Sequence, residues 1–233
     1  MPTATYQSRR SELNDYFDRT ARQAWERLTS DAPVSGIRAT VRAGRDSMRA
    51  TLLSWLPADL TGRRILDAGC GTGALALEAA RRGAEVLAVD IASGLIEVAK
   101  QRAAQTDGRG RIEFLVGDMF DPALGSFHHV IAMDSLIHYR PEDTVRVLAG
   151  LSERTTSSIA FTFAPRTAAL SAMHAVGRFF PRSDRAPSIV PVSEAHLRQL
   201  ITQEPALAPF EVGRHRRVVS GFYTSHAMEL CRR

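Results

Sequence analysis

The sequence predicts an α/β fold in which helices cover a mostly parallel β-sheet, and three observations support this prediction. From Arg64 onward, short apolar runs alternate with segments of helical periodicity. The runs are apolar throughout, which is typical of parallel strands buried on both faces. Farther along, F-E-V-G-R-H-R-R-V-V and F-Y-T-S-H-A-M-E-L are two strand-like runs joined by only a turn, which indicates a closing antiparallel pair.

Two amphipathic helices are expected ahead of this alternation. Apolar residues recur at helical spacing over residues 11–28, with Ser11 as the N-cap, and again over residues 37–56, where Pro57 ends the pattern. We therefore divide the chain into an N-terminal helical arm, residues 1–57, and a main domain, residues 58–233.

The main domain alternates strand and helix up to its fifth strand. The expected strands are R-I-L-D-A, E-V-L-A-V-D, I-E-F-L-V, H-V-I-A-M and S-I-A-F-T-F, and the expected helices are residues 75–82, 94–106 and 141–152. The segment 165–192 that follows is apolar, basic and interrupted by prolines. Because ordinary connections have about two to six residues, we expect a small insertion with its own helix here.

The composition fits one globular domain with a small appendage. The chain has 233 residues, 44% of them hydrophobic, which is enough for one sizeable core. No apolar run approaches the roughly eighteen residues of a membrane-spanning helix, and the first residues lack the apolar stretch of a signal peptide. Cys70 and Cys231 form neither a disulfide framework nor a metal-ligand pattern. We expect a cytoplasmic protein with free thiols and no metal ion of its own.

The net charge of +5 comes almost wholly from arginine, since Lys100 is the only lysine. A guanidinium group binds carboxylate or phosphate through two hydrogen bonds, so some of these arginines are expected to meet anions. A nucleic-acid partner is not expected, because no arginine tract interleaved with aromatic residues is present.

The first expected strand runs directly into the glycine-rich turn L-D-A-G-C-G-T-G, Leu66 to Gly73. Glycine permits positive φ and lets a ligand approach the backbone, and the following helix offers free N–H groups. Gly69-x-Gly71-x-x-Ala74, with Asp90 about twenty residues on, also fits the dinucleotide fingerprint. A carboxylate at Asp67 would repel a pyrophosphate, however, and would attract a cationic ligand.

The turn D-A-G-C-G-T-G resembles the first motif of class I S-adenosylmethionine-dependent methyltransferases. The resemblance implies a Rossmann-like sheet that binds S-adenosylmethionine and releases S-adenosylhomocysteine. The glycines would surround the methionine part beside Asp67, Asp90 would hold the ribose hydroxyls, and Asp118 and Met119 would flank the adenine. The full expected cofactor set is Asp67, Gly69, Gly71, Gly73, Asp90, Ile91, Asp118, Met119 and Asp134.

A polar run, D-S-L-I-H-Y-R-P from Asp134 to Pro141, follows the fourth expected strand. Ligands of parallel sheets gather beyond the carboxyl ends of the strands, so this run is expected to face the acceptor of the methyl group. We predict that His138 lies near the transferred methyl group and acts in catalysis. Asp134 is expected to line the cofactor pocket.

Several further motifs resemble the magnesium-protoporphyrin IX O-methyltransferase family in order and spacing over nearly the whole chain. They are Y-F at 16–17, Trp25, D-S-L-I-H-Y, F-A-P-R-T ending at Thr167, G-R-F-F-P-R-S at 177–183 and F-Y-T-S at 222–225. The resemblance implies methylation of one porphyrin propionate in chlorophyll or bacteriochlorophyll synthesis, with magnesium present only as part of the substrate. Thr29 stands where relatives carry a tyrosine, so no role for that tyrosine is transferred.

A porphyrin needs a wide apolar cover and a few cations. The expected substrate-binding residues are Tyr16, Phe17, Trp25, Tyr139, Arg166, Phe179 and Phe180, with Arg166 as the anchor of the second propionate. A propionate has an ordinary pKa near about 4.5 and is already nucleophilic at neutral pH. The enzyme would then act mainly by positioning and desolvation, while His138 takes a proton or orients the oxygen.

Three alternatives remain open at this point. The chain could methylate another apolar acceptor, such as a quinone precursor or a polyketide. It could carry tetrapyrrole without reacting, or it could be a nicotinamide dehydrogenase. Association with magnesium chelatase is a family expectation, and peripheral contact of the segment 165–192 with a photosynthetic membrane is left open.

Overall fold

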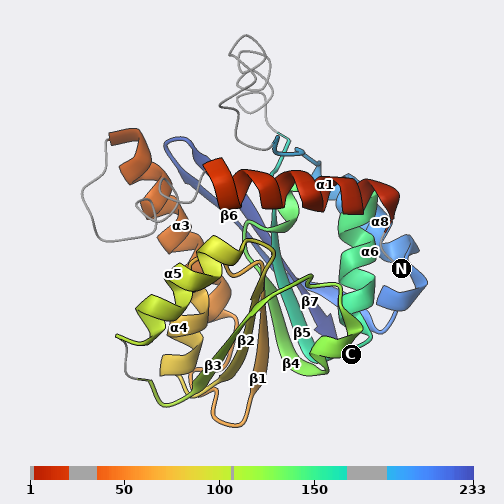
Figure 1. Cartoon of the computed structure of the whole chain (residues 1–233). Coiled ribbons are helices and arrows are strands. Elements are labelled where there is room, and N and C mark those ends of the chain that lie inside the picture. Colours follow the sequence, from red (N-terminus) through yellow and green to blue (C-terminus); the bar gives the residue numbers. More distant parts are fainter. Residues whose placement is uncertain (1–2, 21–35, 106–107, 167–187) are drawn as a thin grey trace.

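A computed structural model describes residues 3–20, 36–105, 108–166 and 188–233 of the chain. Its centre is a seven-stranded sheet with the strand order β3-β2-β1-β4-β5-β7-β6 (Figure 1). The strands are β1 (Arg64–Ala68), β2 (Glu85–Asp90), β3 (Arg111–Val116), β4 (Phe127–Ala132), β5 (Thr155–Phe163), β6 (Phe210–Ser220) and β7 (Tyr223–Arg232). The expected α/β fold is confirmed.

The first five strands are parallel, and the last two close the sheet in the opposite direction. β1 pairs with both β2 and β4, so the strand order reverses between β1 and β4. β7 pairs antiparallel with β5, and β6 pairs antiparallel with β7. The expected closing antiparallel pair is therefore present. In open sheets of this kind, ligands bind where the strand order reverses.

Helices flank the sheet on two sides, and one further helix crosses its end. Figure 1 shows α3, α4 and α5 on one side, α6 and α8 on the other, and α1 across the carboxyl ends of the parallel strands. The helices are α1 (Ala4–Asp15), α3 (Gly36–Ser54), α4 (Ala74–Arg81), α5 (Ser93–Ala103), α6 (Pro141–Ser152) and α8 (Glu194–Gln203). Four short turns complete the elements: η1 (Tyr16–Thr20), η2 (Pro122–Leu124), η3 (Leu136–His138) and η5 (Pro205–Leu207).

The two faces of the sheet pack into two apolar clusters. Successive strand residues point to opposite faces, so Ile65 packs with Met48 and Leu52 of α3, whereas Leu66 packs with Leu148 and other residues of the α6 side. All five side chains are fully buried. Burial on both faces explains why the strands read as continuous apolar runs.

The first helix begins earlier than the sequence indicated. It starts at Ala4, where the Thr3 hydroxyl accepts a hydrogen bond from the Tyr6 backbone N–H at 3.0 Å. The prediction of Ser11 as an N-cap is therefore wrong, because Ser11 lies inside α1. The helix ends in the π-helical turn η1. The rest of the expected helix, with Trp25 and Thr29, lies outside the described residues.

The ends of the expected insertion lie side by side. Pro165 forms a parallel bridge with Val192, and the Val192 N–H donates to the Ala164 carbonyl at 2.9 Å. Residues 167–187 between them, with Phe179 and Phe180, lie outside the described residues. In the part of the chain that the structure describes, no helix is long and apolar enough to cross a membrane.

Candidate functional site

A cavity of about 230 Å³ lies at the carboxyl ends of β1, β2 and β4, where the strand order reverses. α1 contributes Tyr6 and Leu13 to its wall. The other lining residues are Phe17, Arg42, Arg45, Asp46, Arg49, Asp67, Gly69, Cys70, Gly71, Thr72, Ala74, Leu75, Val89, Asp90, Ile91, Leu95, Gly117, Met119, Met133, Asp134, Ser135, His138 and Tyr139.

The glycine-rich turn between β1 and α4 forms the floor of this cavity. Gly69, Gly71 and Gly73 have positive φ values of 80°, 54° and 78°, which other residues rarely adopt. A Cβ atom at Gly69 would lie 2.4 Å from the Cβ of Ser135. Gly69 and Gly71 line the cavity as expected, whereas Gly73 caps α4 and packs toward Phe114.

Asp67 lies beneath the turn with an unsatisfied carboxylate. Its side chain is buried, and among the described residues its Oδ2 atom has no hydrogen-bond partner. Burial, together with the nearby charge of Asp90, raises the pKa of Asp67 to about 7. The carboxylate is therefore poised to ionise when a cation enters the cavity.

Asp90 stands at the end of β2 and holds the turn in place. Its Oδ2 atom accepts a hydrogen bond from the Gly71 N–H at 2.8 Å, and its Oδ1 atom accepts one from the Ala92 N–H at 2.9 Å. Burial raises the pKa of Asp90, and the two backbone hydrogen bonds oppose that shift. Ile91, the next residue, also lines the cavity.

Asp118 and Met119 follow β3, and the structure separates their environments. Met119 lines the cavity, as expected for a residue beside a flat apolar group. The Asp118 carboxylate instead accepts hydrogen bonds from the Tyr6 hydroxyl at 2.6 Å and from Arg10 Nη1 at 2.6 Å. Asp118 thus attaches α1 to the sheet, and it is not among the lining residues.

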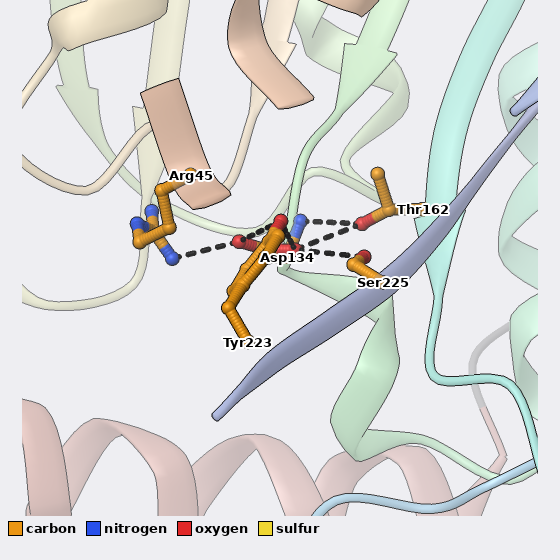
Figure 2. Close-up of polar contacts among 5 residues, drawn as sticks. All are labelled: Arg45, Asp134, Thr162, Tyr223 and Ser225. Carbon is orange, nitrogen blue, oxygen red and sulfur yellow. Dashed lines mark hydrogen bonds and ion pairs between the residues drawn. The ribbon is translucent and has the colours of Figure 1, made fainter. Parts of the chain in front are cut away.

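Asp134 follows β4 and joins four elements (Figure 2). Its carboxylate lies 2.8 Å from Arg45 Nη1 of α3, and it accepts hydrogen bonds from Thr162 of β5 and from Tyr223 and Ser225 of β7. The Thr162 hydroxyl also accepts a hydrogen bond from the Asp134 N–H at 2.7 Å. Asp134 lines the cavity as expected, but protein groups already surround its carboxylate.

His138 also reaches the cavity from η3, and its surroundings keep the ring neutral. Its Nδ1 atom lies 3.3 Å from the Ser188 carbonyl oxygen, and the Phe17 ring packs against it edge-on at 6.3 Å. Burial lowers the pKa of His138 to about 4. The backbone carbonyl of His138 accepts a hydrogen bond from Arg9 Nε of α1 at 2.9 Å. At neutral pH the ring can therefore form hydrogen bonds with a substrate, but it is a weak base.

The remaining expected substrate residues divide into three groups. Phe17 and Tyr139 line the cavity, and Tyr139 stacks on Tyr6 with a ring separation of 4.8 Å. Tyr16 packs against Phe17 but does not line the cavity. Arg166 is exposed and also lies outside the lining set. Trp25, Phe179 and Phe180 are outside the described residues.

The sequence analysis missed two contributions to the cavity. Tyr6 and Leu13 of α1 form one wall, although Tyr6 stands alone in a polar stretch. Arg42, Arg45 and Arg49 of α3 form another. The signal for the arginines was present, because their spacing places them on one face of the helix expected over residues 37–56.

Comparison with known proteins places the chain in a family. One family model, a methyltransferase domain, matches residues 65–157. Another, the magnesium-protoporphyrin IX methyltransferase C-terminus, matches residues 132–232. The magnesium-protoporphyrin O-methyltransferase of Rhodobacter capsulatus is 50% identical over 225 residues, which cover 96% of this chain and 97% of that protein. The chain belongs to the magnesium-protoporphyrin O-methyltransferase family.

The fold agrees with a solved structure of the magnesium-protoporphyrin O-methyltransferase family. The Synechocystis magnesium protoporphyrin IX methyltransferase, solved with bound SAH, matches with a TM-score of 0.84 and 27% identity, over 97% of this chain and 100% of that one. A ubiquinone biosynthesis O-methyltransferase from Xanthomonas oryzae is 35% identical, but the match covers only 60% of this chain and 54% of that protein. Both the family and the class I methyltransferase fold expected from the sequence are confirmed.

Proposed function

We propose that this protein transfers the methyl group of S-adenosylmethionine to a propionate carboxylate of magnesium-protoporphyrin IX, giving the monomethyl ester in (bacterio)chlorophyll synthesis. The observation that carries the proposal is the 50% identity with the Rhodobacter capsulatus enzyme over almost the whole length of both chains. The similarity to the ubiquinone enzyme stops at 60% of this chain, which favours the porphyrin over a quinone precursor as the acceptor.

S-adenosylmethionine fits the part of the cavity formed by β1, β2 and the glycine-rich turn. In this proposal its sulfonium and ammonium groups lie near Asp67, whose buried Oδ2 atom finds no hydrogen-bond partner in the described part of the chain. Asp90 receives the ribose hydroxyls, and Met119 packs on the adenine. A pyrophosphate at the glycine-rich turn would place negative charge against Asp67, which counts against a nicotinamide cofactor.

The chemical step is an in-line displacement. A propionate oxygen attacks the methyl carbon, the new O–C bond forms as the C–S bond breaks, and S-adenosylhomocysteine leaves with the electron pair of the broken bond. An ionised propionate needs no base. If the propionate is protonated in the apolar cavity, the neutral His138 ring orients the attacking oxygen by a hydrogen bond, because a ring whose pKa is lowered to about 4 is too weak a base to take that proton readily.

Positively charged groups for the carboxylates come from α3. Arg42, Arg45 and Arg49 line the cavity, with Arg45 held by Asp134 and Arg49 held by Asp46 at 2.8 Å. We assign to this face of α3 the recognition of carboxylates that enter the cavity. The exposed Arg166 is a weaker candidate for that role in the described structure.

The N-terminal arm acts as a lid in this proposal. The cavity of about 230 Å³ is smaller than the roughly 300–1,000 Å³ of ordinary ligand pockets, although it must admit both a nucleoside and a porphyrin edge. α1 covers it and is attached by polar contacts with Asp118 and the His138 carbonyl and by the burial of Tyr6 and Leu13 against the core. Within the arm of residues 1–57, α1 would therefore open for substrate entry, whereas α3, whose Met48 and Leu52 pack with Ile65, would stay with residues 58–233 as the methyltransferase domain.

Two associations extend the proposal. Magnesium chelatase makes the porphyrin substrate, so direct transfer from it to this protein would keep a poorly soluble ligand out of water. Peripheral contact with the photosynthetic membrane would serve the same purpose in an otherwise cytoplasmic protein. The insertion at 165–192 supports this contact because its sequence is apolar and basic.

The test mixes purified protein with methyl-labelled S-adenosylmethionine and magnesium-protoporphyrin IX, with metal-free protoporphyrin IX as the control. We expect label in a base-labile ester on the magnesium porphyrin. Binding of the porphyrin without label transfer in a single turnover would indicate a carrier. Absence of porphyrin binding would refute the proposal and direct the search to other apolar acids.

A further inference from the structure

A cluster of two histidines and one glutamate lies on the antiparallel side of the sheet, outside the cavity described above. Glu194 is in the first turn of α8, His215 is on β6 and His226 is on β7. In the β6–β7 ladder, His215 pairs with Met228 and Arg217 pairs with His226. This register makes the two histidines diagonal neighbours, and their rings stack at 5.7 Å.

We propose that Glu194, His215 and His226 bind a divalent transition-metal ion, with zinc as the best fit and a water molecule as the fourth ligand. Nothing in the methyl-transfer reaction requires this ion. Two imidazoles and one carboxylate form a donor set that zinc commonly takes in proteins.

The distances between the donor atoms are close to what a tetrahedral ion needs. One ligand atom from each residue lies within 4.8 Å of the other two. Glu194 Oε1 is 3.7 Å from His215 Nδ1, and Glu194 Oε2 is 3.6 Å from His226 Nε2. Donor atoms around tetrahedral zinc lie roughly 3.3–3.5 Å apart, because each bond is about 2.0–2.2 Å long. Side-chain shifts between a few tenths of an ångström and somewhat more than one ångström would bring the three donor atoms to these separations.

The surroundings of His226 support metal binding independently of the distances between the donor atoms. Its side chain is buried, with 8% of the residue exposed, and its Nε2 atom has no hydrogen-bond partner within the residues that the structure describes. Phe163 stacks on the ring at 4.8 Å and fixes its plane. A buried polar atom without a partner is unfavourable, and a metal ion would satisfy it.

The positively charged Arg198 side chain lies beside the proposed site, where it would repel a bound cation. Its Nε atom donates to Glu194 Oε1 at 2.8 Å, which leaves Oε2 on the side of His226. A carboxylate that binds a metal through one oxygen commonly accepts a hydrogen bond on the other, and that bond fixes its orientation. Arg198 can keep this contact as an outer partner of the site.

The ion would connect α8 to the β6–β7 hairpin, next to the residues at which the segment 165–192 returns to the sheet. Glu194 follows Val192 by two residues, and the Val192 carbonyl accepts a hydrogen bond from the Arg166 N–H at 3.0 Å. Just before it, the Val190 N–H donates to the carbonyl of Ile137, the neighbour of His138, at 2.8 Å. The metal would therefore hold the returning end of the segment 165–192 against the sheet.

The test uses the untagged full-length chain, stripped with a chelator and titrated with Co²⁺, whose visible absorption reports tetrahedral binding. We expect one site per chain, with Zn²⁺ displacing Co²⁺. His215→Ala and Glu194→Gln should weaken binding by more than about 100-fold, beyond the loss caused by removing an outer partner. His196→Ala, on the exposed face of the same helix, is the matched control and should bind like the unaltered protein.

His215 is half exposed, so its replacement should leave the fold intact even if the buried His226→Ala variant does not fold. Absence of a stoichiometric Co²⁺ site in the stripped protein would overturn the proposal. So would equal Co²⁺ affinity of His215→Ala and the unaltered chain, or an equal loss in His196→Ala.

Discussion

The Tyr223 hydroxyl donates to the carboxylate of Asp134, whose two oxygens lie 3.1 and 3.2 Å away. This contact connects the end of β4 to β7 across the face of β5. Asp134 has a φ of 53° and is the one non-glycine residue with positive φ among those the structure describes. Such a conformation persists only where neighbouring groups hold it, and here four side chains do so (Figure 2).

Replacing Asp134 should be strongly destabilising. Asp134→Ala would remove the Asp134 carboxylate from beside the mostly buried Arg45 guanidinium and would place alanine at positive φ. We expect a loss of about 3–5 kcal/mol in the free energy of unfolding, measured by urea denaturation. Asp134→Asn keeps the conformation and should lose less, and Tyr223→Phe should lose about 1 kcal/mol. Equal stability of the alanine variant and the unaltered protein would contradict the role of this network.

Asp67 should make S-adenosylmethionine binding depend on pH. Because the pKa of Asp67 is about 7, its carboxyl group is partly protonated at pH 7 in the free protein, and a cationic ligand favours the ionised form. Binding should release a proton and tighten as the pH rises from about 6 to 7.5. Calorimetry in two buffers of different ionisation enthalpy measures this release, which Asp67→Asn should abolish.

The raised pKa of Asp67 should also make the ligand-free protein less stable as the pH rises. The pKa of Asp67 in the folded chain is above its unfolded value of 3.8, so the folded chain binds more protons between about pH 4 and 7. The stabilisation from protonated Asp67 is complete below the unfolded pKa and is lost as the pH rises through 7. An Asp67→Asn variant should lack this decline.

Asp90 should matter for cofactor affinity both directly and through the turn that it holds. Asp90→Ala would remove both the expected ribose contact and the hydrogen bond that holds the Gly71 N–H. We expect S-adenosylmethionine binding to weaken by roughly 1–3 kcal/mol. Glu85→Ala, at the exposed opposite end of β2, is the matched control and should bind normally. Unchanged binding by Asp90→Ala would remove Asp90 from the cofactor site.

His138 should be required for turnover but not for cofactor binding. His138→Ala should lower kcat strongly and leave the affinity for S-adenosylmethionine nearly unchanged, because in the proposed arrangement the residue faces the acceptor. Timed assays of the labelled ester measure kcat, and calorimetry measures the affinity for S-adenosylmethionine. An unaltered rate would exclude His138 from the mechanism.

The pH dependence of the rate gives a second test of His138. Burial lowers its pKa to about 4, so the ring is already neutral at about pH 6. The part of kcat that depends on His138 should therefore stay constant between about pH 6 and 8. A loss of half the rate near pH 6.5, absent from His138→Gln, would show that the histidine titrates as an exposed one does.

Tyr6 should control the attachment of the proposed lid. Its hydroxyl donates to Asp118 at 2.6 Å, and a hydrogen bond to a charged acceptor contributes about 1.5–3 kcal/mol. Tyr6→Phe should increase hydrogen exchange at the α1 amides and raise KM for the porphyrin more than it changes kcat. Tyr16→Phe, at the end of the same helix, should leave both nearly unaltered.

Local signals in the sequence were sufficient for most of the fold. Pro141 marks the first residue of α6, and the helix spans Pro141–Ser152 as expected, because proline is well suited to the first helical position. The apolar runs likewise predicted the five parallel strands and the closing pair. These features depend on residues near one another in the chain.

The parts that sequence reasoning missed depend on contacts between distant residues. Tyr6 is one apolar residue among polar ones, and its burial comes from Tyr139 and Asp118, more than one hundred positions away. Asp118 was expected beside the adenine because of its motif, yet the structure pairs it with α1. Helix periodicity placed Arg45 on α3, but no local pattern could reveal that it pairs with Asp134.

The position of β7 constrains how the sheet is assembled during synthesis. β7 follows β6 in the chain but lies between β5 and β6, so β6 has no neighbouring strand to join when it leaves the ribosome. While it is unpaired, β6 carries the positive charges of Arg214, Arg216 and Arg217, and charge discourages pairing with other chains. β6 is therefore synthesised before β7 but can join the sheet only after β7, the last strand, has paired with β5.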